Sequence, residues 1–304
     1  MSVRSPGLAL SLSASRLGFH VHAGFLAGLT DDLGIRPGFL AGSSSGAFVG
    51  GLFASGIAPG RIHEAMASRA MRRCFWEWRG PLRGVGMALG LPGFTGMLTG
   101  WKLKAFLRGL VGDQRIEDCP DAELTISVTN LTEGHPEILR SGDMIDAILA
   151  SCSVPILFRT VTSRSAHLWD GAIADSSPLY HLADDSRVTS VLVHAVAHER
   201  RGLGEPPKPW TISRALGEAH QIVSDRLLAI SVECALLKGR RVTVLTSIIP
   251  RFRFSEKGSE EVLYAAGRDT VLSHRAEIFG LLGESKATRP LDPLTFGTSP
   301  VGDT

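Results

Sequence analysis

The segment Gly42-Ser43-Ser44-Ser45-Gly46 constrains the fold of this chain more than any other stretch. It reads G-x-S-x-G, follows the apolar run 38–41 and leads into the apolar run 47–52. This order predicts a strand, a tight turn and a helix, with the Ser44 hydroxyl at the top of a sheet beside the free N–H groups of a helix N-terminus. Gly42 and Gly46 keep Cβ atoms out of the turn and tolerate positive φ. A flexible polar linker is the alternative, but apolar runs on both sides favour a nucleophile turn.

The remaining chain alternates short apolar runs with amphipathic helical stretches. The runs predict strands over 8–12, 38–41, 124–130, 137–139, 166–169, 187–196 and 242–249, and helices over 18–33, 45–55, 61–73, 101–110, 143–150, 210–237 and 261–282. Strands that alternate with helices predict an α/β fold, doubly wound, with a mostly parallel sheet and helices on both faces. The first run imitates a short signal peptide, but Arg16, His20 and His22 follow it at once, so we expect a first β-strand.

Composition places the chain among ordinary globular proteins. With 304 residues, 44% of them hydrophobic and 20% charged, it can bury a sizeable core, and we assign residues 1–284 to one domain. A net charge of +2 gives no reason to expect a nucleic-acid partner. The four cysteines are widely spaced and form no CxxC pair, which argues against a disulfide framework or a zinc site and favours a reducing, cytoplasmic location. We expect no metal and no cofactor. The oligomeric state is left open.

Residues 79–100 break the regular pattern with recurring glycines and apolar residues between them. We expect a flexible apolar lid here, because long apolar loops in compact domains are often binding segments. Trp76, Trp78 and Trp101 flank it, and a group of arginines over 69–83 lies beside it, a combination that suits peripheral contact with an anionic membrane. The alternative is that the tryptophans pack in the core and the arginines are simply solvated. Residues 285–304 are predicted to form a loose tail.

Asp170 is the candidate base for Ser44, because it follows a predicted strand. Asp170-Gly171-Ala172 follows the apolar stretch 166–169, although Asp-Gly in that position is more often a plain turn. Together with the serine turn, however, it resembles the Ser-Asp dyad of the patatin-like phospholipase family. Residues 147–158 resemble the family's A-x-x-A-S-x-A-x-P-x-x-F stretch, residues 124–134 its A-T-D-L-x-T-G segment, and residues 172–178 the stretch that follows its D-G-G. The four matches occur in the family's order.

The resemblance implies a hydrolase that needs no histidine. Ser44 would attack the ester carbonyl of a lipid, Asp170 would accept its proton, and water would clear the acyl-enzyme. A carboxylate with an ordinary pKa near 4 is a weak base at neutral pH, but burial beside the serine would raise that pKa. His194 or His198 as a third member remains an alternative, since other α/β-hydrolases place a histidine after the acid.

The oxyanion loop departs from the family pattern. Where the family has G-G-G-x-R/K-G, this chain has Ser13-Ala14-Ser15-Arg16-Leu17-Gly18, which keeps only Gly18. The backbone N–H groups of Ser13, Ala14, Ser15 and Gly18 are the predicted oxyanion donors, because such donors are main-chain groups. Losing one donor costs roughly 100- to 1000-fold in rate, so a weak or inactive protein that binds lipid or a protein partner stays open. An acyltransferase or small-ester hydrolase on the same dyad stays open as well.

Overall fold

A computed structural model describes residues 3–15, 18–163, 165–199, 211–250 and 258–283. The tail predicted over 285–304 lies outside the described residues, as do Arg16 and Leu17 of the predicted oxyanion loop.

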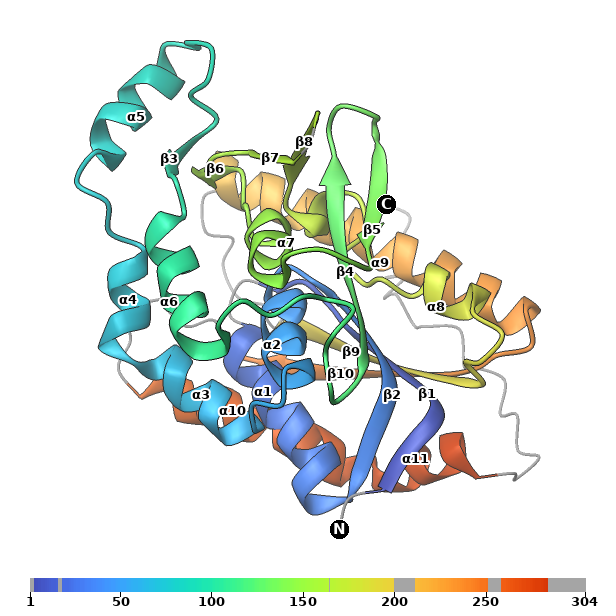
Figure 1. The fold of residues 1–304 in the computed structure, drawn as a ribbon. Helices are drawn as coiled ribbons and strands as arrows, with labels where there is room; N and C mark the ends of the chain where they lie inside the picture. The colour runs from blue at the N-terminus through green and yellow to red at the C-terminus, as the bar shows by residue number, and fades with distance from the viewer. Residues whose placement is uncertain (1–2, 16–17, 164, 200–210, 251–257, 284–304) are drawn as a thin grey trace, which may run out of the picture.

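A mixed, mostly parallel sheet runs through the centre of the molecule (Figure 1). The strand order is β10 (Arg241–Ile249), β9 (Ser190–His198), β1 (Val3–Leu12), β2 (Ile35–Ser43), β4 (Glu123–Asn130), β8 (Ala166–Trp169) and β7 (Val161–Ser163), and β5 (His135–Leu139) pairs with β4. The first five strands pair in parallel, β5 and β8 run antiparallel to β4, and β7 runs antiparallel to β8. The predicted α/β fold with a mostly parallel sheet is confirmed.

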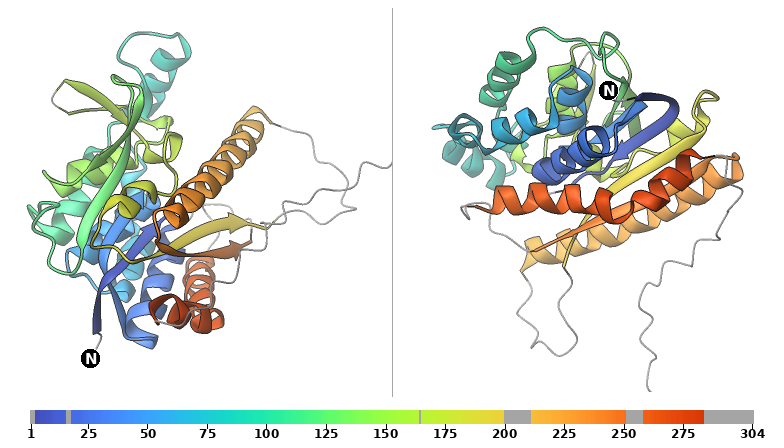
Figure 2. Two further views of the ribbon diagram at one scale, coloured as in Figure 1. Left: turned by 90° about the vertical axis from the view of Figure 1, so that its right-hand side faces the viewer. Right: turned by 90° about the horizontal axis from the view of Figure 1, so that it is seen from below.

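Helices cover both faces of this sheet (Figures 1 and 2). They are α1 (Gly18–Ala27), α2 (Ser45–Ala54), α3 (Pro59–Ala67), α4 (Arg69–Cys74), α5 (Gly80–Ala88), α6 (Trp101–Val111), α7 (Met144–Ser151), α8 (Tyr180–Asp184), α9 (Ile212–Leu237), α10 (Ser259–Ser273) and α11 (Arg275–Leu282), with a π-helical turn over Gly28–Asp32 and a 3-10 turn over Gly171–Ile173. Among the helices of the described residues, none is long and apolar enough to cross a membrane.

The two faces of the sheet are built by alternate residues of the central strands. Leu8, Leu10 and Leu12 of β1 pack into the larger core, with α1, α2, α7 and α10. Ala9 of β1 points the other way and packs with residues of β2, α8 and α9 in a second cluster. Strands buried on both faces read as continuous apolar runs, which is why the sequence identified them.

Several predicted elements differ in detail from the structure. The helix predicted over 61–73 is broken at Ser68, whose backbone is extended and whose hydroxyl accepts a hydrogen bond from the N–H of Met71 to begin α4. The helix predicted over 261–282 is divided at His274 into α10 and α11. Residues 79–100, predicted as a loop, contain α5 and the short strand β3 (Gly96–Leu98), which pairs with β6 (Ile156–Phe158).

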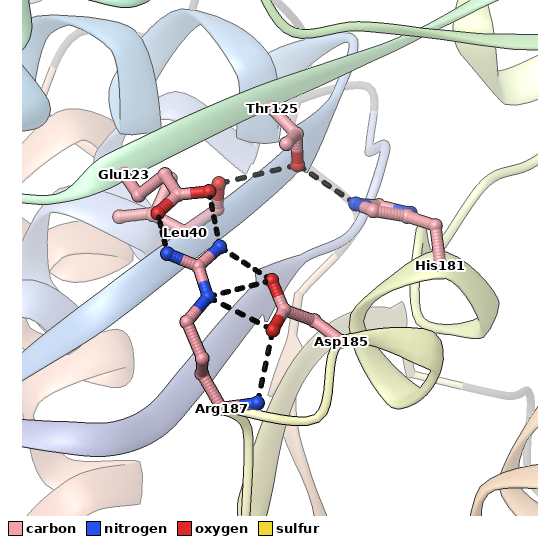
Figure 3. A network of polar contacts seen from close by, with 6 residues as sticks. All are labelled: Leu40, Glu123, Thr125, His181, Asp185 and Arg187. Carbon is pink, nitrogen blue, oxygen red and sulfur yellow. Dashed lines mark hydrogen bonds and ion pairs between the residues drawn. The ribbon is translucent and has the colours of Figure 1, made fainter.

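The strand predicted from residue 187 begins three residues later, because Arg187 belongs to the turn before β9. Its guanidinium donates to both carboxylate oxygens of Glu123 at 2.8 Å and also contacts Asp185 (Figure 3). Beside it, the hydroxyl of Thr125 lies 2.8 Å from Nε2 of His181. This polar group therefore ties the turn between α8 and β9 to the start of β4.

Helices α1 and α10 approach each other closely. A Cβ atom on Gly24 would lie 1.8 Å from the carbonyl oxygen of Tyr264, and one on Gly267 would lie 1.9 Å from the carbonyl oxygen of Val21. The backbones of α1 and α10 are therefore in direct contact at these two glycines. This contact packs α10 against α1, the helix that follows β1.

We predict that Gly24→Ala and Gly267→Ala each lower the free energy of unfolding by about 2–3 kcal/mol, since the added methyl group forces the two helices apart. Gly109→Ala on α6 is the matched control: nothing lies within 4 Å of the added Cβ atom. It should stabilise the protein by about 0.5–1 kcal/mol, because alanine loses less backbone entropy in a helix. Urea denaturation measures all three. A Gly24→Ala protein as stable as the Gly109→Ala protein would contradict the packing argument.

Candidate active site

Ser44 occupies a strained turn at the carboxyl end of β2. Its φ of 49° and ψ of −115° lie outside the regions that ordinary residues adopt, and α2 begins at the next residue. Such strain persists where the surrounding structure enforces it. A Cβ atom on Gly46 would lie 2.1 Å from the carbonyl oxygen of Leu12, and one on Gly42 would lie 2.5 Å from backbone atoms of the turn. Gly42 and Gly46 therefore allow β1, β2 and α2 to pack closely, and the chain makes a sharp turn at Ser44 between β2 and α2.

Asp170 lies directly opposite this turn, at the end of β8. The Ser44 hydroxyl donates to Oδ2 of Asp170 at 2.9 Å, and Oδ1 accepts a hydrogen bond from the N–H of Ala172 at 2.8 Å. The Asp170 side chain is 2% exposed. Burial raises the pKa of Asp170 to about 7, against the opposing effect of its two hydrogen bonds. Gly171 has a role in this approach, since a Cβ atom there would lie 2.3 Å from the carbonyl oxygen of Ser127.

Side chains that the sequence did not single out hold both members of the pair. The hydroxyl of Ser151 accepts a hydrogen bond from the N–H of Ser44 at 2.8 Å and donates to the carbonyl oxygen of Ser127 at 2.7 Å. The hydroxyl of Thr129 donates to the carbonyl oxygen of Asp170 at 2.7 Å. Ser151 lies in the stretch 147–158 that resembles the family, but nothing in that pattern indicates which backbone groups it contacts.

Cys152 also contacts the serine turn. Its thiol donates to the carbonyl oxygen of Ser44, with sulfur and oxygen 3.2 Å apart. Burial, and secondarily the charge of Asp170, raise the pKa of the Cys152 thiol well above its ordinary value. The Cys152 thiol therefore stays protonated and acts as a hydrogen-bond donor.

The loop before α1 lies beside the serine turn, with its described N–H groups bonded inside the protein. The N–H of Ser13 donates to the carbonyl oxygen of His194, that of Ala14 to the carbonyl oxygen of Ser176, and that of Ser15 to the hydroxyl of Ser45. The N–H of Gly18 donates to the carbonyl oxygen of Ser15 at 3.3 Å. Their assignment as oxyanion donors stays a prediction, and it requires that substrate replace at least one of these acceptors.

Two buried histidines, His22 and His194, are hydrogen-bonded to each other and to the backbone of this loop. Nδ1 of His22 lies 2.8 Å from Nδ1 of His194, and Nε2 of His22 lies 2.8 Å from the carbonyl oxygen of Ser13. A carbonyl only accepts, so His22 carries its proton on Nε2; neutral His22 then accepts at Nδ1 from His194. Burial lowers the pKa of both rings, to about 4 for His22, which keeps them neutral. Nε2 of His194 in turn lies 2.9 Å from the hydroxyl of Ser247.

This network bears on the histidine alternative. Both ring nitrogens of His194 contact His22 and Ser247 rather than Ser44 or Asp170. His198 is the last residue of β9, four residues beyond His194. The titratable side chain that is hydrogen-bonded to the Ser44 hydroxyl is the carboxylate of Asp170.

A large cavity, about 1580 Å³ in volume, lies next to the pair. Its walls come from α6, α7, the β4–β5 hairpin and residues 93–101. Neither Ser44 nor Asp170 is among its lining residues, but Cys152 is, and Cys152 contacts the backbone of Ser44. The cavity therefore reaches the serine turn from the side of α7.

The raised pKa of Asp170 predicts a pH-dependent stability difference. An aspartate whose pKa is higher in the folded state stabilises the fold while protonated, and this contribution is lost as the pH rises from about 4 to about 7. Asp170→Asn removes the titration. We predict that its stability relative to the natural protein rises by about 2 kcal/mol between about pH 5.5 and about pH 8, at about 1.4 kcal/mol per pKa unit. Urea denaturation at both pH values measures it; a difference independent of pH would show an ordinary pKa.

This chain is similar to several known proteins. Residues 17–183 match the family model described as patatin-like phospholipase. Lysophospholipase NTE1 of Yarrowia lipolytica is 32% identical over 158 residues, which are 52% of this chain but span only 10% of that protein. Among solved structures, VipD from Legionella pneumophila gives a TM-score of 0.46 at 12% identity, covering 89% of this chain and 66% of that one. ExoU, in its complex with SpcU from Pseudomonas aeruginosa, gives 0.41 at 15% identity, covering 90% and 52%. The family model matches more than half of the sequence, so this chain belongs to the patatin-like phospholipase family.

Proposed function

We propose that this protein is a lipid acyl hydrolase in which Ser44 is the nucleophile and Asp170 the general base. The observation that carries the proposal is the 2.9 Å hydrogen bond from the Ser44 hydroxyl to a buried carboxylate. A pKa of about 7 matches that carboxylate to proton transfer at neutral pH better than an ordinary aspartate would.

The proposed reaction has two halves. Ser44 Oγ attacks the ester carbonyl while Asp170 takes its proton, and that proton passes to the departing alcohol as the acyl-enzyme forms. Water then attacks the acyl-enzyme while Asp170 takes its proton. The bond between Ser44 Oγ and the acyl carbon breaks, Asp170 returns the proton to Ser44 Oγ, and the fatty acid leaves. Membership of the patatin-like phospholipase family and the relative named a lysophospholipase support a lipid ester as substrate, of the phospholipase A or lysophospholipase type.

The hydrogen bonds of the loop before α1 favour a second candidate. Because the N–H groups of Ser13, Ala14, Ser15 and Gly18 have acceptors within the protein, the oxyanion site would be weak unless the loop rearranges. The second candidate is therefore a slow or inactive protein of the same fold that binds lipid or a protein partner. An acyltransferase or small-ester hydrolase would use the same pair with a different acceptor or substrate.

Turnover of p-nitrophenyl esters of increasing acyl length tests the pair. We predict that Ser44→Ala and Asp170→Asn each lower kcat by at least about a thousandfold, because the two groups act as one unit. Ser55→Ala at the far end of α2 and Asp175→Asn are matched controls that should stay within about threefold. Burial also raises the pKa of Asp175, to about 6, so this control distinguishes the dyad from any perturbed carboxyl nearby.

The outcomes separate the candidates. Equal rates in the natural protein, Ser44→Ala and Asp170→Asn would exclude the dyad. No turnover at any chain length would favour the inactive candidate, and turnover restricted to short acyl chains would favour a small-ester hydrolase.

The pH profile is a separate prediction. Asp170 accepts a proton only when ionised, so kcat/KM should rise with pH and level off above an apparent pKa of about 7. Initial rates with a soluble ester between about pH 5 and about pH 9 measure the profile. A midpoint near the ordinary aspartate pKa of about 4 would show that burial does not tune this base.

A further inference from the structure

A segment between α4 and α6 carries large apolar side chains on its outer surface. This segment, residues 76–101, which we call the arm, contains α5 and β3 and stands away from the sheet at the same end as the β4–β5 hairpin (Figures 1 and 2). Trp76 and Trp78 are each 72% exposed, and Trp101 is 60% exposed. Leu82, Val85, Leu89, Leu91 and Phe94 are exposed on it as well. The lid predicted over 79–100 thus projects from the body, and its flanking tryptophans are outside the core.

The arm and its two neighbouring helices are strongly basic. Residues 65–112 contain eight arginines and lysines but one acidic residue, whereas the whole chain has a net charge of only +2. Arg72, Lys104 and Arg108 form ion pairs with residues outside this stretch. Arg69, Arg73 and Arg79 are exposed and form no ion pair with any carboxylate of the described residues. The guanidinium of Arg79 lies 4.6 Å from the ring centre of Trp78, so a cation and an indole share the outer surface.

The single acidic residue of this stretch, Glu77, is buried and therefore does not neutralise the positive charge on the outer surface of the arm. Glu77 is 6% exposed, and its carboxylate accepts hydrogen bonds from the N–H and hydroxyl of Thr99, from the N–H of Gly100 and from Arg83. These bonds join the two ends of the arm. Glu77 therefore ties the part of the chain that carries Trp76 and Trp78 to the part that leads into Trp101.

The arm is seated firmly on the body. A Cβ atom on Gly96 of β3 would lie 2.1 Å from the backbone of Phe158 in β6, and the two strands pair in parallel. The C-terminal end of the arm lines the large cavity with Thr99, Gly100 and Trp101. Whatever the arm binds is therefore brought next to the cavity that reaches the serine turn.

These observations identify one kind of partner. Exposed indoles favour the headgroup level of a bilayer, exposed leucines enter its acyl boundary, and arginines attract anionic lipid. We propose that the arm docks this protein on the surface of an anionic membrane, with the large cavity facing the lipid. The purpose of docking rests on the proposed lipid hydrolase function, but docking itself does not require turnover.

Flotation with vesicles tests the arm. The probe is the full chain with Ser44→Ala, so that hydrolysis cannot alter the vesicles, which are made of phosphatidylcholine alone or of an equal mixture with phosphatidylserine. We expect the protein to float with the anionic vesicles and to remain at the bottom with phosphatidylcholine. Added salt should weaken binding, because it screens the arginines. Tryptophan emission should shift to the blue, since three of the five tryptophans lie on the arm.

Matched variants locate the contact. Trp76→Ala with Trp78→Ala, and separately Arg79→Glu, should each weaken binding to anionic vesicles by about tenfold or more. Leu216→Ala with Ile222→Ala removes comparably exposed apolar side chains from α9, and Arg275→Glu makes the same charge change on α11. Both controls should bind within about twofold of the parent.

Three results would overturn the arm as docking surface: no flotation with anionic vesicles, equal binding to both kinds of vesicle, or equal loss in the arm and control variants. Failure of the hydrolase proposal would look different. Flotation by the Ser44→Ala chain, without ester turnover by the natural protein, would remove the dyad and leave the arm. Turnover of a soluble ester without flotation would remove the arm and leave the dyad.

Discussion

The close meeting of β1, β2 and α2 around Ser44 is the constraint on which the site depends. Gly46 touches the backbone of Leu12, and Gly42 touches the turn itself, so a side chain at either position would push the strand and helix apart. The turn therefore adopts a φ of 49° at Ser44, a conformation that strand geometry would never supply. Two further contacts, from Ser151 to the N–H and from Cys152 to the carbonyl oxygen, hold that peptide in place.

The position of the proposed base, Asp170, depends on the same packing. Asp170 ends a strand that runs antiparallel to β4, and its carboxylate turns inward because Gly171 fits against the backbone of Ser127. Burial raises the pKa of this carboxylate, so its ionised form is less stable in the folded protein and, in the proposed mechanism, a stronger base. A buried carboxylate lowers the stability of the folded protein when it is ionised. Such a loss of stability is commonly retained at functional sites.

Behind the site, the neutral pair of His22 and His194 connects the loop before α1 to β9 and β10. Because the carbonyl oxygen of Ser13 can only accept, one tautomer of each ring satisfies the whole chain of hydrogen bonds. The loop beside the serine turn is thereby tied to β9 and to the edge strand β10. Any rearrangement that freed its N–H groups for an oxyanion would have to keep or replace these bonds.

The sequence by itself determined the fold class and the strand, turn and helix around Ser44, and it indicated Asp170 as the proposed partner of Ser44, since apolar runs, glycine spacing and the order of motifs are local properties of the chain. The central strands were predicted because they are buried on both faces and read as unbroken apolar runs. Tertiary structure decided what depends on neighbours distant in the chain: the break at Ser68, the helix within 79–100, the partners of Ser151 and the histidine pair. The 2.9 Å hydrogen bond between Ser44 and Asp170 also depends on tertiary structure, because the two residues are 126 positions apart and only the packed sheet brings them together. The same packing excludes water from Asp170, and this burial raises its pKa above the ordinary value of an aspartate.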